Sequence, residues 1–277
     1  MCKLTRQNDF ADVKALRLKV IAVIPARYSS TRFAGKVLAK DTGKFLIQHT
    51  YEQACLAKLP EKVIIAADDE KVVAAAKTFD AECVLTSPDH QSGTDRIAEA
   101  VADMDVEIVV NLQGDEPEID PGNIDYLARL LMDNPDCPMA TLSADFQTAG
   151  QVADPNIVKV IVARGDAAAR DEGRGTRDET GRAIYFSRSP IPYDREEAGV
   201  GNVRQYLRHL GIYAYRKQFL LEITTLPQTP LEKIEKLEQL RAIENGYPIL
   251  VGKVQHTCDG IDTPEQYAEF VKRYKKK

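Results

Sequence analysis

The stretch VIAVIPARYSSTRFAGK, residues 20–36, joins an apolar run to a basic loop. Val20–Pro25 is apolar throughout and ends in proline, which predicts a buried strand. The loop that follows carries three cationic side chains, at Arg27, Arg32 and Lys36. Since ligands of parallel α/β sheets bind beyond the carboxyl ends of the strands, this loop is expected at the ligand-binding edge of a sheet.

The composition of this loop is typical of an anion-binding site. Arginine supplies forked donors for phosphate oxygens, and lysine supplies a mobile point charge. Gly35 lets backbone N–H groups approach a phosphate closely, and Ser30 adds a hydroxyl. The loop matches neither a Walker A sequence nor a GxGxxG turn. A solvated basic loop is the plain alternative, but this set of residues at one strand end favours a polyphosphate site.

Apolar runs alternate with segments of helical periodicity along the first half of the chain. This alternation predicts strand–helix–strand units with right-handed crossovers, and therefore an α/β fold with a mostly parallel sheet. The further strands expected there are Val63–Ala67, Glu82–Leu85, Glu107–Leu112 and Met139–Ala144, and the expected helices are Leu46–Lys58, Glu70–Phe79, Ile97–Met104 and Ile124–Met132.

The alternation weakens after about residue 150, which divides a single domain into halves at 20–150 and 151–277. Arg164–Arg182 is rich in charge, alanine and glycine, so a solvated hairpin tip or mobile loop is expected there. Leu231–Glu244 has apolar residues at helical spacing and predicts one amphipathic helix. The other expected elements are strands at Ile157–Val162, Ala183–Phe186, Gly211–Tyr215 and Ile249–Val254 and a closing helix at Pro264–Tyr274.

Charge and hydropathy narrow the class of protein. The chain has 277 residues, of which 44% are hydrophobic and 29% are charged. The 37 basic and 42 acidic residues give a net charge of -5, which argues against a nucleic-acid partner. The apolar runs are far shorter than the roughly 20 residues of a membrane span, so no membrane span is expected.

The cysteines and the first residues bear on location. The five cysteines are scattered without zinc-site spacing, and reduced thiols in the cytoplasm are expected. Met1–Lys19 mixes charged residues throughout and has no apolar core. An N-terminal extension before the first strand is therefore expected rather than a signal peptide.

Two more motifs follow predicted strands. Gln113-Gly114-Asp115-Glu116-Pro117 places a carboxylate where it could hold Mg²⁺ against a triphosphate, although an ordinary turn has the same composition. The segment 86–96 precedes a predicted helix, and Ser92, Thr94 or Asp95 could cap that helix. Its alternative role is to present a helix N-terminus to a base or ribose.

The second half supplies polar residues suited to a sugar acid. Arg188 could pair with a carboxylate through two parallel hydrogen bonds. Asp262 could cap the last helix or provide a second metal ligand, 262 − 115 = 147 positions after Asp115. His209 could equally be a structural histidine, and residues 238 and 239 could face solvent. The residues with donors and acceptors for sugar hydroxyls are His209, Tyr213, Glu238 and Gln239.

Taken in order, these stretches resemble the 3-deoxy-manno-octulosonate cytidylyltransferase (CMP-KDO synthetase) family from about Val20 to the C-terminus. Eight motifs carry the resemblance, and their coincidence is far more specific than any one of them. They are IPAR at 24–27, STRFAGK at 30–36, HQSGTDR at 90–96, QGDEP at 113–117, YFSR at 185–188, RHLGIY at 208–213, LEQLR at 237–241 and GIDTP at 260–264.

The resemblance implies a nucleotide-diphosphosugar-transferase-like three-layer sandwich with a smaller dimerisation subdomain. It implies a homodimer that uses Mg²⁺ to couple CTP and KDO into CMP-KDO and pyrophosphate for lipopolysaccharide synthesis. Asp115 and Asp262 would hold the metal, and with Lys36 they would form the catalytic set. The implied nucleotide-binding residues are Arg27, Ser30, Arg32, Lys36, Ser92, Gly93 and Arg96, and the implied sugar-binding residues are Gln113, Arg188, His209, Tyr213, Glu238 and Gln239.

Some positions depart from the family's usual pattern. Arg-Leu-Pro-Gly-Lys-Pro is common in the first loop, whereas this chain has Arg-Phe-Ala-Gly-Lys-Val at 32–37. An 8-amino analogue of KDO or another acidic sugar, such as a nonulosonate, therefore remains an alternative substrate. A catalytically inactive nucleotide-binding module is the alternative of another class.

Overall fold

The computed structural model describes residues 18–29, 33–164 and 180–276. Most of the expected N-terminal extension and most of the expected loop at 164–182 lie outside the described residues, as do Ser30 and Arg32. Thr180–Arg182 belongs to a strand rather than to a loop.

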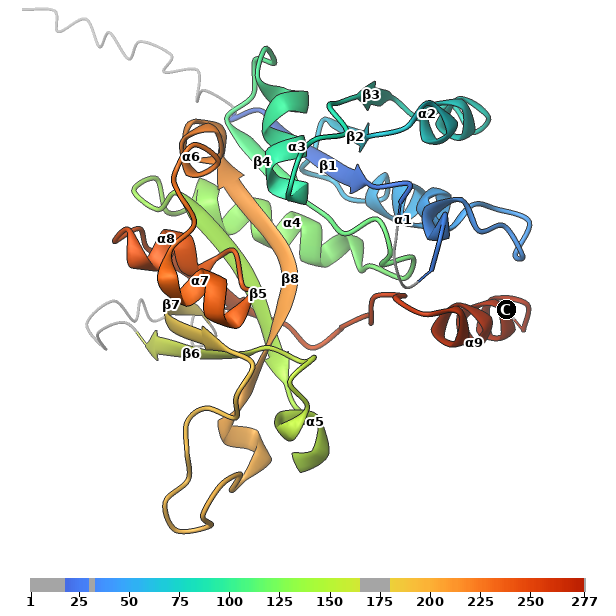
Figure 1. Cartoon of the computed structure of the whole chain (residues 1–277). Helices are drawn as coiled ribbons and strands as arrows, with labels where there is room; N and C mark the ends of the chain where they lie inside the picture. Colours follow the sequence, from blue (N-terminus) through green and yellow to red (C-terminus); the bar gives the residue numbers. More distant parts are fainter. Residues whose placement is uncertain (1–17, 30–32, 165–179, 277) are drawn as a thin grey trace, which may run out of the picture.

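The described strands form one sheet of nine, in the order β3-β2-β1-β4-β8-β5-β9-β7-β6. Figure 1 shows the first-half strands β1–β4 on one side of the long strand β8, and β5, β6 and β7 on the other. The strands are β1 Val20–Ala26, β2 Lys62–Ala67, β3 Cys83–Leu85, β4 Ile108–Asn111, β5 Met139–Asp145, β6 Lys159–Arg164, β7 Thr180–Ser187, β8 Leu207–Arg216 and β9 Ile249–Lys253.

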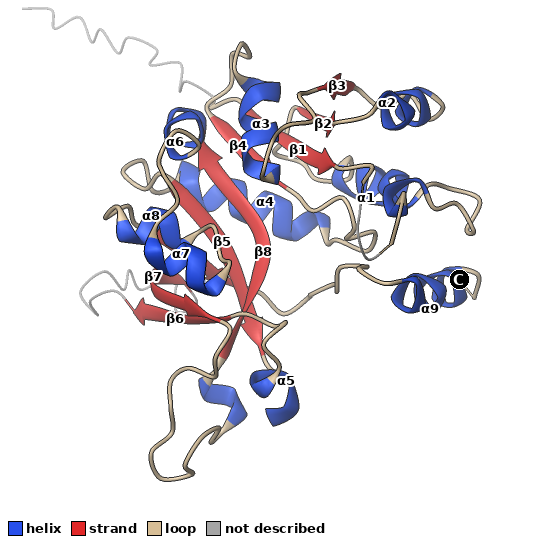
Figure 2. Ribbon diagram, viewed as in Figure 1, coloured by secondary structure: helices blue, strands red, loops and turns tan. Residues whose placement is uncertain are grey.

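Helices cover both faces of this sheet (Figure 2). Alternate residues of β1 point to opposite faces, so Ala22 and Ile24 join one apolar core while Ile21 and Val23 join the other. The first core includes residues of α1 Leu46–Ala54, α2 Glu70–Lys77 and α4 Pro121–Met132. The second includes residues of α3 Gly93–Val101, α6 Lys217–Ile223, α7 Pro230–Glu235 and α8 Leu240–Glu244. The expected three-layer sandwich is confirmed.

The sheet is less parallel than the sequence predicts. β3, β2, β1 and β4 are parallel, as expected of the first half. β8 runs antiparallel to both β4 and β5, and β6 and β7 form an antiparallel pair. The order of strands and helices along the chain does not show that β8, from the second half, lies between β4 and β5. The expectation of a mostly parallel sheet is therefore wrong for the second half.

The single helix expected at Leu231–Glu244 is also wrong, because it is broken in two. Lys236 ends α7 in a left-handed conformation with φ of 55°, and α8 begins only at Leu240. The two helices are tied by a buried ion pair in which Arg241 Nη2 lies 2.6 Å from Glu232 Oε1. The break turns residues 237–239 away from a helical path, which matters for the site below.

Short elements without strong periodicity escaped prediction. They are η1 Lys36–Leu38, α5 Ala149–Ala153, η4 Val203–Gln205 and helix α6. Among the described residues, no helix has the length and apolarity that a membrane crossing requires.

The last helix, α9 Pro264–Tyr274, has the predicted bounds and lies at the side of the molecule next to the first-half loops (Figure 1). Tyr267 and Phe270 pack with Leu46 and Ile261 in a small cluster of their own. The Asp41 N–H donates to the Tyr267 hydroxyl at 2.8 Å. These contacts hold the segment that contains Asp262 beside the first-half loops.

Candidate active site

Two aspartates from opposite ends of the chain meet at one lysine. Lys36 Nζ lies 2.6 Å from Asp115 Oδ2 and 3.1 Å from Asp262 Oδ1. The Lys36 side chain is 12% exposed, so the ammonium is shielded by the two carboxylates but still reachable from solvent. The predicted convergence of Asp115 and Asp262 beside the basic loop is confirmed.

Backbone geometry explains why the two carboxylates meet. A Cβ at Gly114 would lie 3.0 Å from the Pro25 carbonyl oxygen, so the chain before Asp115 passes β1 at a distance that favours glycine. The Ile261 N–H donates to the Asp115 carbonyl at 2.9 Å and fixes the segment before Asp262. Thr263, rather than Asp262, caps α9, in a capping box with Gln266. The Asp262 carboxylate is therefore not the helix cap.

The residues present fit a divalent cation. Carboxylate oxygens are the ligands that Mg²⁺ prefers, and two of them already converge on a positive charge. In the described part of the chain no group of three His, Cys, Asp or Glu side chains forms a metal cage. A pair of carboxylates suits Mg²⁺, which usually keeps several waters and binds substrate phosphates as well.

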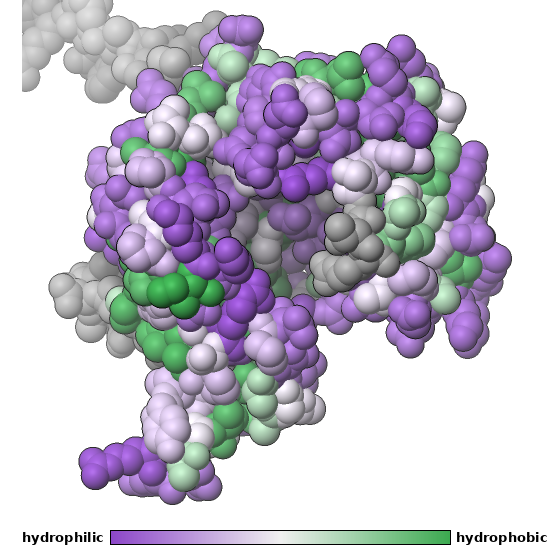
Figure 3. All heavy atoms as spheres, in the orientation of Figure 1, coloured by the Kyte–Doolittle hydropathy of each residue, from purple (hydrophilic) through white to green (hydrophobic). Residues whose placement is uncertain are grey.

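A cavity of about 220 Å³ is lined by Gln113, which lies two residues before Asp115. The space-filling view shows a hollow on this face with mostly hydrophilic side chains around it (Figure 3). The cavity brings together five residues that the sequence predicts for the substrates, namely Gly93, Gln113, Tyr213, Glu238 and Gln239. Gln113 is held there by its amide, which donates to the Gly211 carbonyl at 2.7 Å.

Further cavity residues were missed by the sequence analysis. Thr94, Asn111 and Tyr215 also line the cavity. Asn111 Oδ1 and Gln239 Nε2 are buried there without a hydrogen-bond partner. Because an unpaired buried polar atom is unfavourable, each of them suits a partner on a ligand. The one feature of the sequence that marks Asn111 is its position as a lone polar residue at the end of an apolar run.

The environment of the cavity is poorly solvated. Burial raises the pKa of Tyr213 well above its usual value, and burial also raises the pKa of Glu238. Burial is the main reason for both shifts because removing the charged form from water is unfavourable. Hydrogen bonds formed by a ligand in such a place are shielded from competing water.

His209 lies behind the cavity wall rather than in it. Its ring packs 5.5 Å from the ring of Tyr213, and its Nε2 lies 3.1 Å from Thr141 Oγ1. It borders instead a separate cavity of about 60 Å³ together with Arg208 and Glu116. Burial, followed by the charge of Arg208, lowers the pKa of His209 to about 3. The side chain is therefore neutral and supports Tyr213 from behind.

Acid is expected to destabilise the fold through this histidine. The folded pKa lies below the ordinary value of about 6.5, so the unfolded chain takes up the proton first as pH falls. The contribution of His209 to stability should fall by about 1.4 kcal/mol per pH unit between roughly pH 6 and pH 4, as a difference between wild type and a variant without the histidine. Urea unfolding of wild type and His209→Gln over this range measures the effect, and equal slopes in both proteins would contradict it.

Arg188 is engaged by the protein itself. Its Nε donates to the Glu235 carbonyl at 2.7 Å and its Nη1 to the Pro155 carbonyl at 3.0 Å. Its backbone N–H donates to Glu235 Oε2 at 2.9 Å. Arg188 lines neither of the two cavities described above. Contact with a sugar carboxylate would require this guanidinium to exchange its present partners.

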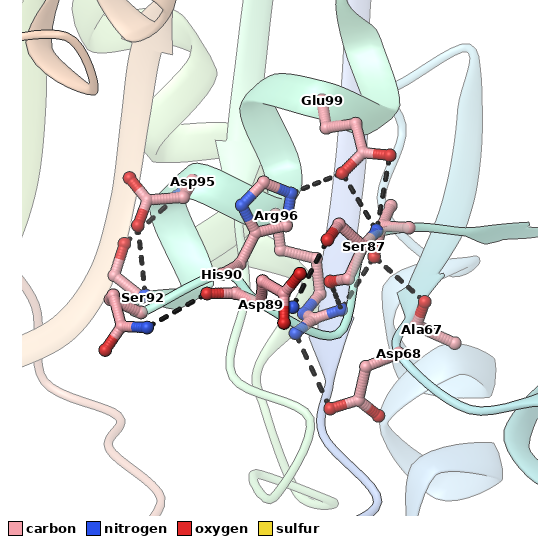
Figure 4. A network of polar contacts seen from close by, with 11 residues as sticks. Ala67, Asp68, Ser87, Asp89, His90, Ser92, Asp95, Arg96 and Glu99 are labelled. Atoms are coloured by element: carbon pink, nitrogen blue, oxygen red, sulfur yellow. Dashed lines mark hydrogen bonds and ion pairs between the residues drawn. The ribbon is translucent and has the colours of Figure 1, made fainter.

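The start of α3 has the predicted capping. Ser92 is the N-cap, and its side chain and that of Asp95 form a reciprocal capping box. Gly93 packs against Pro25 at the cavity. Arg96 is completely buried, and its Nη1 donates to Thr86 Oγ1 at 2.7 Å (Figure 4). Direct contact with a nucleotide would need this side chain to leave its buried position.

Arg27 is exposed and directly follows the last residue of β1. Ser30 and Arg32, which complete the predicted phosphate-binding set, lie outside the described residues.

Comparison with known proteins shows the family of this chain. A sequence model of the cytidylyltransferase family matches residues 21–253. A 3-deoxy-manno-octulosonate cytidylyltransferase from Solibacter usitatus is 46% identical over 257 residues, covering 93% of this chain and 95% of the relative. One of the same description from Geobacter sulfurreducens is 40% identical over 266 residues, covering 93% and 100%.

Solved structures give the same result. A structure described as CMP:2-keto-3-deoxy-manno-octonic acid synthetase complexed with CTP matches with a TM-score of 0.81 and 39% identity, covering 93% of this chain and 99% of that one. A cytidylyltransferase from Leptospira borgpetersenii, at 17% identity and a TM-score of 0.56, shares the fold. The chain therefore belongs to the cytidylyltransferase family, and its resemblance to the 3-deoxy-manno-octulosonate cytidylyltransferases is confirmed.

Proposed function

We propose that this enzyme couples CTP with KDO to give CMP-KDO and pyrophosphate for lipopolysaccharide synthesis. The observation that carries the proposal is that one loop serves two sites. Gln113 lines the polar cavity, and Asp115, two residues later, meets Lys36 and Asp262. A sugar in the cavity would thus lie beside a place that favours phosphates and a cation.

The reaction we propose is an in-line attack of the anomeric C2 hydroxyl of the sugar on the α-phosphorus of CTP. The bond to the pyrophosphate oxygen breaks as the new ester forms, and the hydroxyl proton is released. Triphosphate and sugar acid are both anions, so their approach is unfavourable without compensating charge. Lys36 and Arg27 would offset the charge of the nucleotide, and positioning in the poorly solvated cavity would supply most of the acceleration.

Mg²⁺ is the proposed cofactor, held by Asp115 and Asp262. When bound it would neutralise phosphate charge and lower the pKa of the attacking hydroxyl. The proposed chemistry needs no serine or cysteine nucleophile, and we expect no covalent enzyme intermediate.

Pyrophosphate release from CTP and KDO tests the proposal. The same assay with 8-amino-KDO and with a nonulosonate separates the alternative sugars, and UTP in place of CTP tests the base. CTP binding without pyrophosphate release with any acidic sugar would instead support an inactive nucleotide-binding module. The meeting of Lys36 with both aspartates favours the enzyme.

Asn111→Leu is expected to weaken use of the sugar selectively. The substitution removes the unpartnered Oδ1 and keeps the number and branching of the side-chain heavy atoms, so a sugar hydroxyl in the cavity loses an acceptor. One lost hydrogen bond to a buried group corresponds to about a tenfold rise in KM for the sugar. Steady-state rates measure it, and a rise in KM for CTP of the same size would contradict this role.

We also propose a homodimer in the cytoplasm. Apolar side chains of the second half, among them Ile184, Tyr193 and Ile234, are 55%, 67% and 78% exposed, which suits an interface between copies. The described cysteines Cys55, Cys83, Cys137 and Cys258 are free thiols, in keeping with a reducing compartment. Light scattering of the purified protein tests the dimer.

A further inference from the structure

Asp68 follows β2 and ties the end of β1 to the rest of the molecule. Its Oδ1 accepts the Tyr28 backbone N–H at 2.8 Å, and its own N–H donates to the Ala26 carbonyl at 3.3 Å. The Asp68 side chain is only 10% exposed, so little water competes for these bonds. Asp68 therefore fixes the chain at the point where the strand becomes the basic loop.

Arg96 holds Asp68 from the other side (Figure 4). Its Nη2 lies 3.5 Å from Asp68 Oδ2, while its Nη1 donates to Thr86 Oγ1 and to the Ser87 carbonyl. Burial, which is complete, lowers the pKa of Arg96, and the charge of Asp68 opposes that shift. A buried guanidinium needs such a counter-charge. The pair is thus a fixed support within the fold.

Tyr28 connects Asp68 to Gly35, at the other end of the basic loop. Its carbonyl accepts the Gly35 N–H at 3.3 Å, and its ring lies 3.6 Å from the position of a Cβ on Gly35. Lys71 Nζ lies 4.3 Å from the centre of the same ring. Gly35 has φ of 66° and directly precedes Lys36. Tyr28 therefore sets the position of the residue before the lysine that meets Asp115 and Asp262.

We propose that Asp68 is a positioning residue for the phosphate end of the active site. It acts through Tyr28 and Gly35 on Lys36 and is itself held by Arg96. Its contacts run to the basic loop and to the buried Arg96 rather than to Tyr213 and its neighbours in the cavity, so its loss should affect CTP and spare the sugar. The proposal rests on the proposed function for the identity of the nucleotide.

Two double variants isolate the bond to Tyr28. Asp68→Ala/Arg96→Met removes the acceptor, and Asp68→Asn/Arg96→Met replaces it with an amide oxygen. Both lack the guanidinium, so neither leaves a buried charge unpaired. The alanine variant is expected to show KM for CTP, and Kd for CTP by calorimetry, about tenfold above the asparagine variant. KM for the sugar at saturating CTP should be the same in both.

Tyr28→Ala tests the second link without disturbing the buried pair. It keeps the N–H and removes the ring between Gly35 and Lys71, and KM for CTP should rise about tenfold. Thr148→Ala is the matched control, since Thr148 caps α5 through the Gln151 N–H. It should lower the melting temperature and leave KM for CTP unchanged.

The positioning role would be overturned by equal CTP affinity in the two double variants, or by a rise in KM for the sugar as large as the rise in KM for CTP. An unchanged KM for CTP in Tyr28→Ala would also overturn it. If the wild type binds CTP but uses no acidic sugar, the proposed function fails. The calorimetric comparison of the double variants then still decides the role of Asp68.

Discussion

Asp115→Asn is expected to reduce pyrophosphate release by about 100- to 1000-fold while the protein stays folded. Asparagine has nearly the same shape, and the backbone carbonyl that accepts the Ile261 N–H is unchanged. What is lost is the negative charge 2.6 Å from Lys36 Nζ. Without it, one of the two carboxylates that would hold Mg²⁺ is gone, and the anionic substrates meet with less compensating charge.

Steady-state kinetics and thermal unfolding together check this expectation. Asp115 is 25% exposed and its ion pair with Lys36 is partly solvated, so the melting temperature should change by no more than about 2–4 °C. Asp120→Asn is the matched control, because Asp120 caps α4 through the Gly122 N–H and asparagine caps equally well. It should have wild-type rates. Full activity of Asp115→Asn with Mg²⁺ would end the metal proposal.

The part of the site that follows strands in the first half could be predicted from the sequence. Apolar runs place Arg27 and Asp115 just after strand ends, and the ends of parallel strands meet at one edge of a sheet. The pairing of β1 with β4 brings these two ends side by side, as expected. Local periodicity thus suffices wherever neighbouring strands are parallel and joined by helices.

The remaining part depends on contacts that are distant in the sequence. Asp262 reaches Lys36 because α9 packs beside the first-half loops, and only the resemblance to a family indicated this. Glu238 and Gln239 reach the cavity because the chain turns at Lys236, a residue with no evident preference for positive φ. The amphipathic spacing of the segment predicted one helix and therefore missed the turn.

Two residues show why a motif does not fix a role. Arg96 and His209 both fall in motifs that imply ligand contact, yet both side chains are buried and neither lines the cavity of Gln113 and Tyr213. Sequence spacing gives the motif but not the direction of the side chain. Arg96 instead pairs with Asp68, and the His209 ring packs against the ring of Tyr213.

Lys36→Met is expected to slow the reaction and at the same time to strengthen the binding of a divalent cation. Loss of the ammonium removes a counter-charge for the triphosphate, so kcat/KM for CTP should fall by about 100-fold or more. The same loss removes the ammonium that lies within 3.1 Å of both Asp115 and Asp262. Two neighbouring carboxylates repel, and a divalent cation relieves that repulsion. The nucleotide-free variant should therefore bind Mn²⁺ more tightly than the wild type does.

Electron paramagnetic resonance of Mn²⁺ titrations measures the affinity, and pyrophosphate release measures the rate. Lys40→Met is the control, since Lys40 lies in the same loop with its Nζ 4.5 Å from the centre of the Phe45 ring. It should leave both quantities at wild-type values. Weaker Mn²⁺ binding by Lys36→Met would mean that the lysine organises the two carboxylates for the ion. Tighter Mn²⁺ binding with slower turnover would mean that the ammonium and the divalent cation compete for the same two carboxylates. Both positive charges would then be needed once the triphosphate binds.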